Sequence, residues 1–338
     1  MTALTDIYRC LKTVGFTKGQ VVSLLPEWWE PDMARSASGL QETALLLGRR
    51  LNLSATALLE GRAERTIDLS APRYKHTVRV SQEQLVPATL IASSLAKAIV
   101  GAMPDRDVEL ARNAAAVRKQ ILAPEGARMD FDALLDYCWS RGVPVIPLPN
   151  LPKGLRKMDA AAIKVGQRPA ILIALRNNSK AWLSFLLAHE LGHLCLNHVP
   201  DNAALVEGSL SDSAEFDAES QIDTQEAEAN DFASALLAGR EAETVVQGWA
   251  RGLPAVTLAT TARRAANEFR TAPGHLVLRY AFVTKRWPDA RIALNFLADD
   301  MDAQATLVQR LQKEVDTNQI GDDLSDYVLQ ITGVMPQG

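Results

Sequence analysis

The sequence predicts an α+β protein that is mostly helical, with a small sheet of about three strands near its middle. Apolar residues recur at helical spacing over most of the 338-residue chain. Three short apolar runs of β type, VPVIPLP, DAAAIKV and PAILIAL, are instead concentrated between residues 143 and 175. With 47% hydrophobic residues the chain can bury a sizeable core, and its length favours two or three domains.

Residues 1–65 predict a domain of short helices. Apolar spacing and capping residues mark helices in TDIYRCLKTVG, in FTKGQVVSLL with Thr17 as N-cap, in GLQETALLLGRRLNL, and in SATALLEG with Ser54 as N-cap. This succession favours a helix-turn-helix-like domain. The segment PEWWEPDMARSAS stands where a recognition helix is expected, and it offers only Arg35 for contacts with bases or phosphates.

Three further regions follow along the chain. Residues 66–125 are expected to hold a linker and then a long amphipathic helix that starts with a capping box at SQEQ. Residues 126–240 contain the three β-type runs and two helices, AWLSFLLAHELGHLCLNH and TQEAEANDFASALLAG. Residues 241–338 are expected to form a helical C-terminal region.

The charge is unevenly distributed. Residues 121–239 carry 9 Lys+Arg against 16 Asp+Glu, and no Lys or Arg occurs from Ala181 to Gly239. Such a region attracts cations and basic peptides and repels nucleic acid. No apolar run is long enough for a membrane span and no signal-peptide pattern is present, so a cytoplasmic location without membrane contact is expected. The three cysteines are odd in number and far apart, which predicts reduced thiols.

The segment AHELGHLCLNH contains the motif most directly tied to chemistry, His189-Glu190-Leu191-Gly192-His193. Residues four apart on a helix project to the same side, so both imidazoles can bind one tetrahedral metal ion. Glu190 projects beside them, where its carboxylate can take a proton from metal-bound water. The alternative is a buried helix with two structural histidines, but a chance HExxH is expected only about once in two hundred such chains.

A catalytic zinc ion needs a third protein ligand and an open fourth position. His198 is the nearest candidate in sequence, but it lies nine residues after His189 and is interpreted as a helix-end histidine. Two carboxylates on the second helix, Glu226 and Glu228, are better candidates. Glu228 shares the face of Phe232, and a core-facing carboxylate is costly unless it is paired or metal-bound, so Glu228 is preferred over Glu226.

From the third β-type run onward, RNNSKAWLSFLLAHELGHLCLNH followed by EAEANDFASALL resembles the ImmA/IrrE metallopeptidase family, over roughly residues 130 to 280. The resemblance implies a zincin-like core, in which a small sheet accompanies the HExxH helix and a Glu helix. It also implies that His189, His193 and Glu228 bind zinc, with Glu190 as general base. Members of this family often carry an N-terminal helix-turn-helix domain of the lambda-repressor type, and GLQETALLLGRRLNLSATALLEG is similar to the end of such a domain.

The resemblance implies a zinc-dependent, site-specific endopeptidase of the gluzincin type (HExxH plus Glu), which cleaves a repressor-type partner in a stress, DNA-damage or phage-defence pathway. The alternative is a non-proteolytic, DNA-binding transcription regulator that uses the zinc domain as a sensor. A housekeeping peptidase is disfavoured by the regulator-like N-terminal helices. His275 and Tyr280 are the candidate oxyanion donors, although a structural role is favoured for each. The strand Pro169–Leu175 is a candidate edge for an extended substrate.

Overall fold

A computed structural model describes residues 3–66, 82–105, 108–155, 158–207, 224–297 and 301–335 of the chain. The protein is α+β and mostly helical, with a small mixed sheet, which confirms the coarse fold class predicted from the sequence. The expected linker, the capping box at Ser81 and most of the acidic stretch from Asp201 to Asp223 lie outside the described residues.

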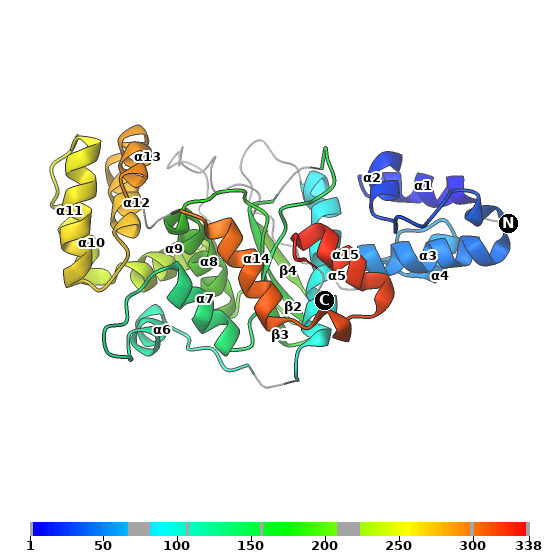
Figure 1. Cartoon of the computed structure of the whole chain (residues 1–338), viewed down its shortest axis with the longest axis horizontal. Helices are drawn as coiled ribbons and strands as arrows, with labels where there is room; N and C mark the ends of the chain where they lie inside the picture. The colour runs from blue at the N-terminus through cyan, green and yellow to red at the C-terminus, as the bar shows by residue number, and fades with distance from the viewer. Residues whose placement is uncertain are drawn as a thin grey trace.

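The helical elements before the sheet are α1 (Leu4–Thr13), α2 (Lys18–Ser23), the 3-10 turn η1 (Met33–Arg35), α3 (Ala37–Leu51), α4 (Ala55–Leu59), α5 (Gln82–Ala102), α6 (Ala114–Ile121) and α7 (Phe131–Ser140). The sheet region comprises β1 (Val145–Pro147), β2 (Ala160–Val165), β3 (Arg168–Ile173), α8 (Lys180–Cys195), β4 (Ala204–Glu207) and α9 (Thr224–Leu237). The C-terminal elements are α10 (Arg240–Gln247), α11 (Ala255–Glu268), α12 (Pro273–Thr284), α13 (Trp287–Asn295), α14 (Ala303–Glu314), the 3-10 turn η4 (Thr317–Gln319) and α15 (Asp322–Thr332). In Figure 1 the sheet lies in the middle of an elongated molecule, between α1–α4 at one end and α10–α13 at the other.

Each of the three predicted β-type runs forms a strand, and a fourth strand, β4, joins them. The order across the sheet is β1-β3-β2-β4; β1 and β3 are parallel, and the other neighbours are antiparallel. The expectation that Pro169–Leu175 forms an edge is wrong, because β3 pairs with β1 on one side and with β2 on the other. Among the described strands, the edges are β1 and β4.

Both faces of the sheet are covered by helices. α5 and α8 each contact β2 and β3, and the residues of β3 from Pro169 to Ile173 are all buried. Two-sided burial explains why this strand is continuously apolar rather than alternating. α5 is the one helix in the described ranges that is long and apolar enough to cross a membrane, but 78% of that stretch is buried inside the molecule, as in the core helix of a soluble protein.

The helices α1–α4 form the N-terminal end of the molecule, and Thr17 and Ser54 cap α2 and α4 as predicted. The segment between α2 and α3, which is fully described, contains only the three-residue turn η1, so no α-helix stands where a recognition helix was expected. Trp29 is buried in this segment, and its Nε1 donates to Thr43 Oγ1 at 2.9 Å. Packing against α3 therefore determines the conformation here.

The last helices of the chain, α14 and α15, pack on the sheet and on the N-terminal helices. α14 packs on β1, and α15 contacts α3 and α5. Arg50 of α3 is buried and donates to Leu24 O at 2.6 Å and to Asp323 O at 2.9 Å, while the Tyr327 hydroxyl donates to Arg50 O at 2.8 Å. One hydrophobic core consequently extends from α1 to α15, whereas α10–α13 form a second hydrophobic cluster with Ala181.

The segment from Ala293 to Val315 has apolar residues at helical spacing, but it contains parts of two helices. α13 ends at Asn295, and α14 begins at Ala303 after Asp302, whose φ of 70° is incompatible with a continuous α-helix. This interruption separates the second hydrophobic cluster from the return of the chain to the sheet.

The three cysteines are free and buried, as expected for reduced thiols. Burial raises the pKa of the Cys195 thiol, at the end of α8, to about 12. Cys195 therefore remains protonated near neutral pH and serves as a packing residue.

The helices α8 and α9 pack closely against each other, and the approach is especially close at Gly192. A Cβ added at Gly192 would lie 3.1 Å from Cδ1 and 3.2 Å from Cβ of Phe232 on α9. Contacts this short are tighter than nearly all real Cβ contacts, so a side chain at this position requires Phe232 to move by a few tenths of an ångström. The glycine of the HExxH segment thus sets the spacing of the two helices.

We predict that Gly192→Ala lowers the stability of the protein, although Ala exceeds Gly in helix propensity by about 1 kcal/mol. Overpacking against Phe232 should cost about 1–3 kcal/mol and outweigh that gain. Denaturant unfolding should report a lower midpoint. Gly101→Ala on α5 is the matched control, because a Cβ added there meets nothing within 4 Å, and it should leave stability unchanged or raise it. An equal gain in both variants would contradict the close approach of α8 and α9.

Candidate metal centre

α8 carries the HExxH segment in its C-terminal half. The helix starts after Ser179, whose hydroxyl oxygen accepts a hydrogen bond from Trp182 N. It is buried along nearly its whole length, because it contacts β2, β3, α7, α9 and α12. His189, Glu190 and His193 have no exposed surface. Since the two histidines are four residues apart, their rings lie on the same side of the helix, with their Nε2 atoms 3.0 Å apart.

The third member of the group is Glu226, in the first turn of α9. Its Oε2 lies 3.4 Å from His189 Nε2, and its Oε1 lies 3.4 Å from His193 Nε2. The three buried side chains could hold a metal ion. A tetrahedral zinc ion with bonds of about 2.0–2.1 Å places its ligand atoms about 3.3–3.4 Å apart. The two distances to Glu226 match this value, and the 3.0 Å between the Nε2 atoms is a few tenths of an ångström shorter. The three donors can therefore surround such an ion, with one position left for solvent or substrate.

The structure brings Glu226, not the predicted Glu228, to the histidine pair. The face of α9 that is buried against α8 includes Glu226, Ala229 and Ala233, whereas the Glu228 side chain is 53% exposed. Residues two apart on a helix project about 200° apart, so only one of the two carboxylates can face α8. The preference for Glu228 relied on its spacing from Phe232. Phe232 is buried, but it lies at one border of the buried face, and Glu228 projects beyond that border.

Asn230 determines which nitrogen of His189 carries the proton. Its Oδ1 lies 3.1 Å from His189 Nδ1, and a side-chain amide oxygen only accepts hydrogen bonds. The proton of the neutral imidazole is therefore on Nδ1, and Nε2 presents its lone pair toward the metal position. No role for Asn230 is expected from the sequence, although this residue lies one turn after Glu226 within EAEANDFASALL.

His198 reaches the same site because of how α8 ends. Asn197 adopts a left-handed conformation with a φ of 59°. The N–H groups of Asn197 and His198 donate to Leu194 O at 3.2 Å and to His193 O at 2.9 Å, which is the Schellman pattern that Asn tolerates at its left-handed position. The turn brings His198 Nδ1 to 3.0 Å from His193 Nδ1. His198 is thus at the helix end as expected, and it also contacts a metal-binding candidate.

His193, His198 and Glu228 form a chain of hydrogen bonds. Its Oε2 lies 3.0 Å from His198 Nε2, and an ionised carboxylate only accepts, so His198 donates through Nε2. His198 Nδ1 then accepts from His193 Nδ1–H, which leaves the lone pair of His193 on Nε2. Glu228 therefore orients a candidate ligand through His198 rather than joining the group of three.

These orienting contacts have a common consequence. With both protons held on Nδ1, the Nε2 lone pairs of His189 and His193 converge with the Glu226 carboxylate in a buried space. Three electron-rich groups this close repel one another in a low-dielectric interior unless a cation lies among them. Two imidazoles and one carboxylate are a donor set that suits zinc.

Glu190 lies on α8 directly after His189. Both of its carboxylate oxygens are buried, so this carboxylate acts in a water-poor environment. Its place next to the histidine pair suits a general base for a solvent molecule at the fourth metal position.

The two candidate oxyanion donors lie in the C-terminal helices. The Tyr280 hydroxyl accepts from Gly252 N and Leu253 N, each at 2.9 Å, and donates to Ala250 O at 3.0 Å, so it holds the connection between α10 and α11. His275 is buried, with its Nδ1 3.1 Å from Thr271 Oγ1. Desolvation lowers the pKa of His275 to about 3, with a smaller contribution from the positive charge of Arg118, so its ring is neutral.

A cavity of about 520 Å³ lies beside α8. Its walls come from the β3–α8 connection, the N-terminal half of α8, α9, α12 and α13. Asn230, which contacts His189, lines this cavity, and so does Phe185, whose ring centroid is 6.4 Å from that of His189. The cavity and the metal group are therefore adjacent, although the sequence motifs gave no indication of a cavity.

Comparisons with known proteins do not identify a family. No protein-family model matches the chain, and no curated protein or solved structure matches it. Functional interpretation therefore depends on the geometry of the site and on the motifs themselves.

We predict that Glu226→Gln greatly reduces zinc binding, because it removes the only carboxylate among the three donors. Elemental analysis of the purified full chain should fall from about one zinc ion per chain to a small fraction of that value. Asp231→Asn is the control, since Asp231 is exposed on the same helix and the substitution changes the charge equally. Full zinc content in Glu226→Gln would exclude Glu226 as a ligand.

We also predict that Glu228→Ala weakens zinc binding without abolishing it. Loss of a carboxylate that orients a ligand histidine typically costs about 10–100-fold in metal affinity, and the exposure of Glu228 favours the lower end. Competition with a chromophoric chelator measures the affinity. Glu228→Gln should recover most of it, because the amide oxygen can still accept from His198 Nε2. Unchanged affinity in Glu228→Ala would show that the chain through His198 has no role in binding.

Proposed function

We propose that this protein is a zinc-dependent endopeptidase of the gluzincin type. The observation that carries the proposal is the buried group of His189, His193 and Glu226, whose ligand atoms lie within 4.8 Å of one another, next to the buried carboxylate of Glu190. Three protein ligands with an open fourth position are typical of catalytic zinc, whereas structural zinc usually has four protein ligands.

Peptide hydrolysis needs an activated water molecule, a proton acceptor and stabilisation of the charge that develops on the carbonyl oxygen. A zinc ion held by these residues supplies a Lewis acid that acidifies water and polarises the carbonyl group. Glu190 takes the proton of the attacking water and delivers it to the leaving amine nitrogen, as the C–O bond forms and the amide C–N bond breaks. Asn230 and His198 keep the two imidazole rings in the required tautomer.

A regulatory substrate is proposed from the resemblance to the ImmA/IrrE family and from the N-terminal helices. In this proposal the protein acts in the cytoplasm and cuts a repressor-type partner under stress, DNA damage or phage attack. The burial of the site supports selective cleavage. Because His189, Glu190 and His193 have no exposed surface, a substrate must present an extended or locally unfolded segment to reach them.

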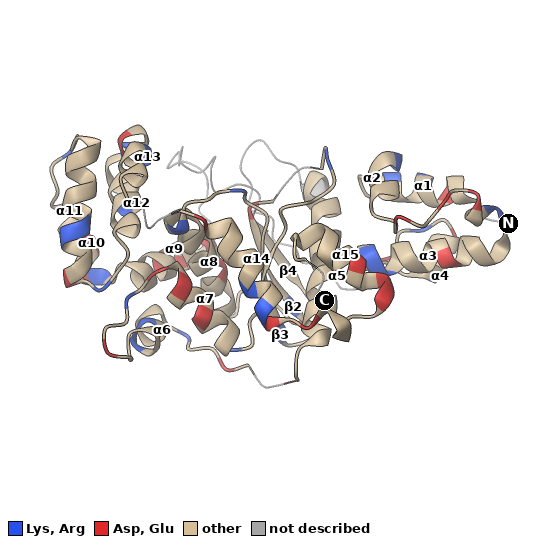
Figure 2. Ribbon diagram, in the orientation of Figure 1, with Lys and Arg blue, Asp and Glu red and all other residues tan. Residues whose placement is uncertain are grey.

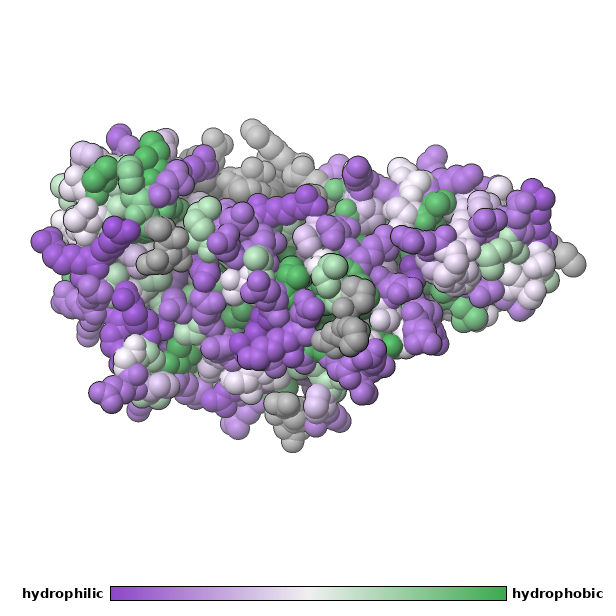
Figure 3. All heavy atoms as spheres, in the orientation of Figure 1, coloured by the Kyte–Doolittle hydropathy of each residue, from purple (hydrophilic) through white to green (hydrophobic). Residues whose placement is uncertain are grey.

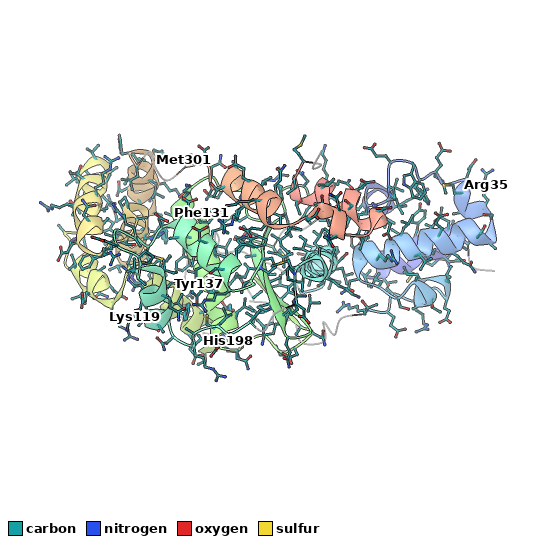
Figure 4. The ribbon with its side chains drawn as sticks, turned by 60° about the horizontal axis from the view of Figure 1, so that its bottom comes forward. Arg35, Lys119, Phe131, Tyr137, His198 and Met301 are labelled. Carbon is teal, nitrogen blue, oxygen red and sulfur yellow. The ribbon has the colours of Figure 1, made fainter. Side chains whose placement is uncertain are left out.

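The alternative of a DNA-binding regulator with a sensing zinc domain is less favoured by the contacts of the N-terminal helices. Reading of bases requires cations or amides on a helix in the major groove. Several cations in this region are already in ion pairs, namely Arg9–Asp6, Arg35–Asp32, Arg49–Asp323 and Arg62–Glu60. Figure 2 shows acidic and basic residues interspersed over these helices, and Figure 4 places Arg35 at the end of the molecule remote from His198.

The proposal predicts that Glu190→Gln retains zinc but loses cleavage of a repressor that is encoded beside this chain and co-expressed with it. Removal of a general base should slow cleavage by at least about 10²–10⁴-fold. Gel analysis of the repressor measures cleavage, and elemental analysis measures zinc. Glu241→Gln, at an exposed position on α10, should change neither. Full cleavage by Glu190→Gln would refute the peptidase mechanism.

A further inference from the structure

The cavity beside α8 is lined mainly by apolar side chains. Trp182 and Phe185 come from α8, Leu278 and Phe282 from α12, and Trp287 from α13. Trp182 and Trp287 stack, with ring centroids 5.7 Å apart. A volume of about 520 Å³ lies within the range of about 300–1,000 Å³ that is usual for ligand sites. The cavity is therefore large enough for a ligand of several side-chain groups.

His275, which lines the cavity, holds a buried hydrogen-bond acceptor. The Thr271 hydroxyl has one hydrogen to donate, and it lies 2.5 Å from Leu237 O and 3.4 Å from Met129 O. Thr271 Oγ1 therefore accepts from His275 Nδ1–H, 3.1 Å away, and the lone pair of the neutral ring is on Nε2. This Nε2 is buried and has no hydrogen-bond partner within the described ranges.

Trp287 adds a hydrogen-bond donor. Its Nε1–H can only donate, and it is buried with no partner among the residues that the structure describes. His275 also lines a second, more polar cavity, whereas Trp287 lines only the apolar one of the two. Both residues line the apolar cavity. Buried polar groups are normally hydrogen-bonded, so a ligand that reached these two atoms from the cavity would supply the partners that they lack.

We propose that this cavity binds an apolar segment of the polypeptide substrate. Large aliphatic or aromatic side chains would pack against Trp182 and Trp287, and backbone amides would pair with His275 Nε2 and Trp287 Nε1. A peptide backbone carries both an N–H donor and a carbonyl acceptor, which matches this wall. The inference rests on the proposed peptidase function and names its substrate class, since Asn230 joins the cavity wall to His189.

The surface beside the cavity supports an apolar partner. Ile292 of α13, Phe296 directly after this helix, and the nearby Met301 are 50%, 47% and 45% exposed. Figure 3 shows apolar side chains gathered at the end of the molecule that contains α11–α13. Met301 also lines the cavity, and Figure 4 shows it near α12 and α13, well away from His198. Apolar surface therefore continues from the cavity to the exterior. Exposed apolar patches commonly mark interaction sites, so this continuity favours an apolar partner.

The test uses NMR signals of the indole N–H groups in the full-length Glu190→Gln variant. The probes are the blocked tripeptide acetyl-Leu-Phe-Leu-amide and its polar counterpart acetyl-Gly-Ser-Gly-amide. The Trp287 signal, assigned by its loss in Trp287→Phe, should shift downfield with the apolar probe and not with the polar one. Trp28, which is 53% exposed at the N-terminal end, is the internal control and should not shift.

Calorimetric titration of variants supplies a second measurement. Trp287→Phe keeps an apolar ring but removes the donor, and it should weaken binding of the apolar probe by about threefold to tenfold. Ser234→Phe, which fills the cavity from α9, should abolish binding, whereas Ile292→Phe on the exposed surface should not. An unshifted Trp287 signal, or unchanged binding by Ser234→Phe, would overturn the inference.

The outcomes separate this inference from the proposed function. Binding of the apolar tripeptide without cleavage of any protein substrate would support the cavity assignment and count against the peptidase. Cleavage of the repressor at an unchanged rate by Ser234→Phe would support the peptidase and overturn the cavity assignment. Binding of free indole as tightly as the tripeptide would also overturn it, because the site would then accept small apolar molecules without a backbone amide.

Discussion

The approach of α9 to α8 is the contact on which the candidate site depends. Gly192 allows Phe232 to pack so closely against α8 that a Cβ at this position would require Phe232 to move by a few tenths of an ångström. Six residues earlier on α9, Glu226 reaches the Nε2 atoms of both histidines. Metal–ligand bonds tolerate only a few tenths of an ångström of variation, so a small outward shift of α9 would separate the third donor from the other two.

Burial makes the position of each proton matter. An imidazole with its proton on Nε2 could not bind a metal through that atom. Asn230 and the His198–Glu228 pair hold the protons on the opposite nitrogens. The half-exposed Glu228 lets the outer end of this chain remain solvated, so only the inner groups bear the cost of burial.

The parts of the structure that the sequence predicts are those with local signals. HExxH places two imidazoles and a carboxylate at fixed spacing on one helix, and two-sided burial makes β3 continuously apolar from Pro169 to Ile173. The choice between Glu226 and Glu228 is not local, because α9 is rich in alanine (EAEANDFASALL) and several of its faces look equally apolar. Only packing against α8 selects one of them. β4 escapes prediction for a similar reason, since it has four residues in an acidic stretch and exists through pairing with β2.

A ligand-binding cavity is harder to predict from the sequence than a metal site. A metal centre needs a few donor atoms at fixed distances, so it leaves a motif. The cavity wall is assembled from residues between 175 and 301 on separate elements, and no spacing rule connects them. Its position is nevertheless explained by the two hydrophobic clusters, because α8 and α9 belong largely to the first and α12 and α13 to the second. Two separately packed units leave space where they meet, and ligand sites commonly form at such boundaries. The three candidate metal ligands lie on α8 and α9, the helices that belong largely to the first cluster. The boundary between the two clusters can then supply the surface area that binding of a substrate polypeptide requires.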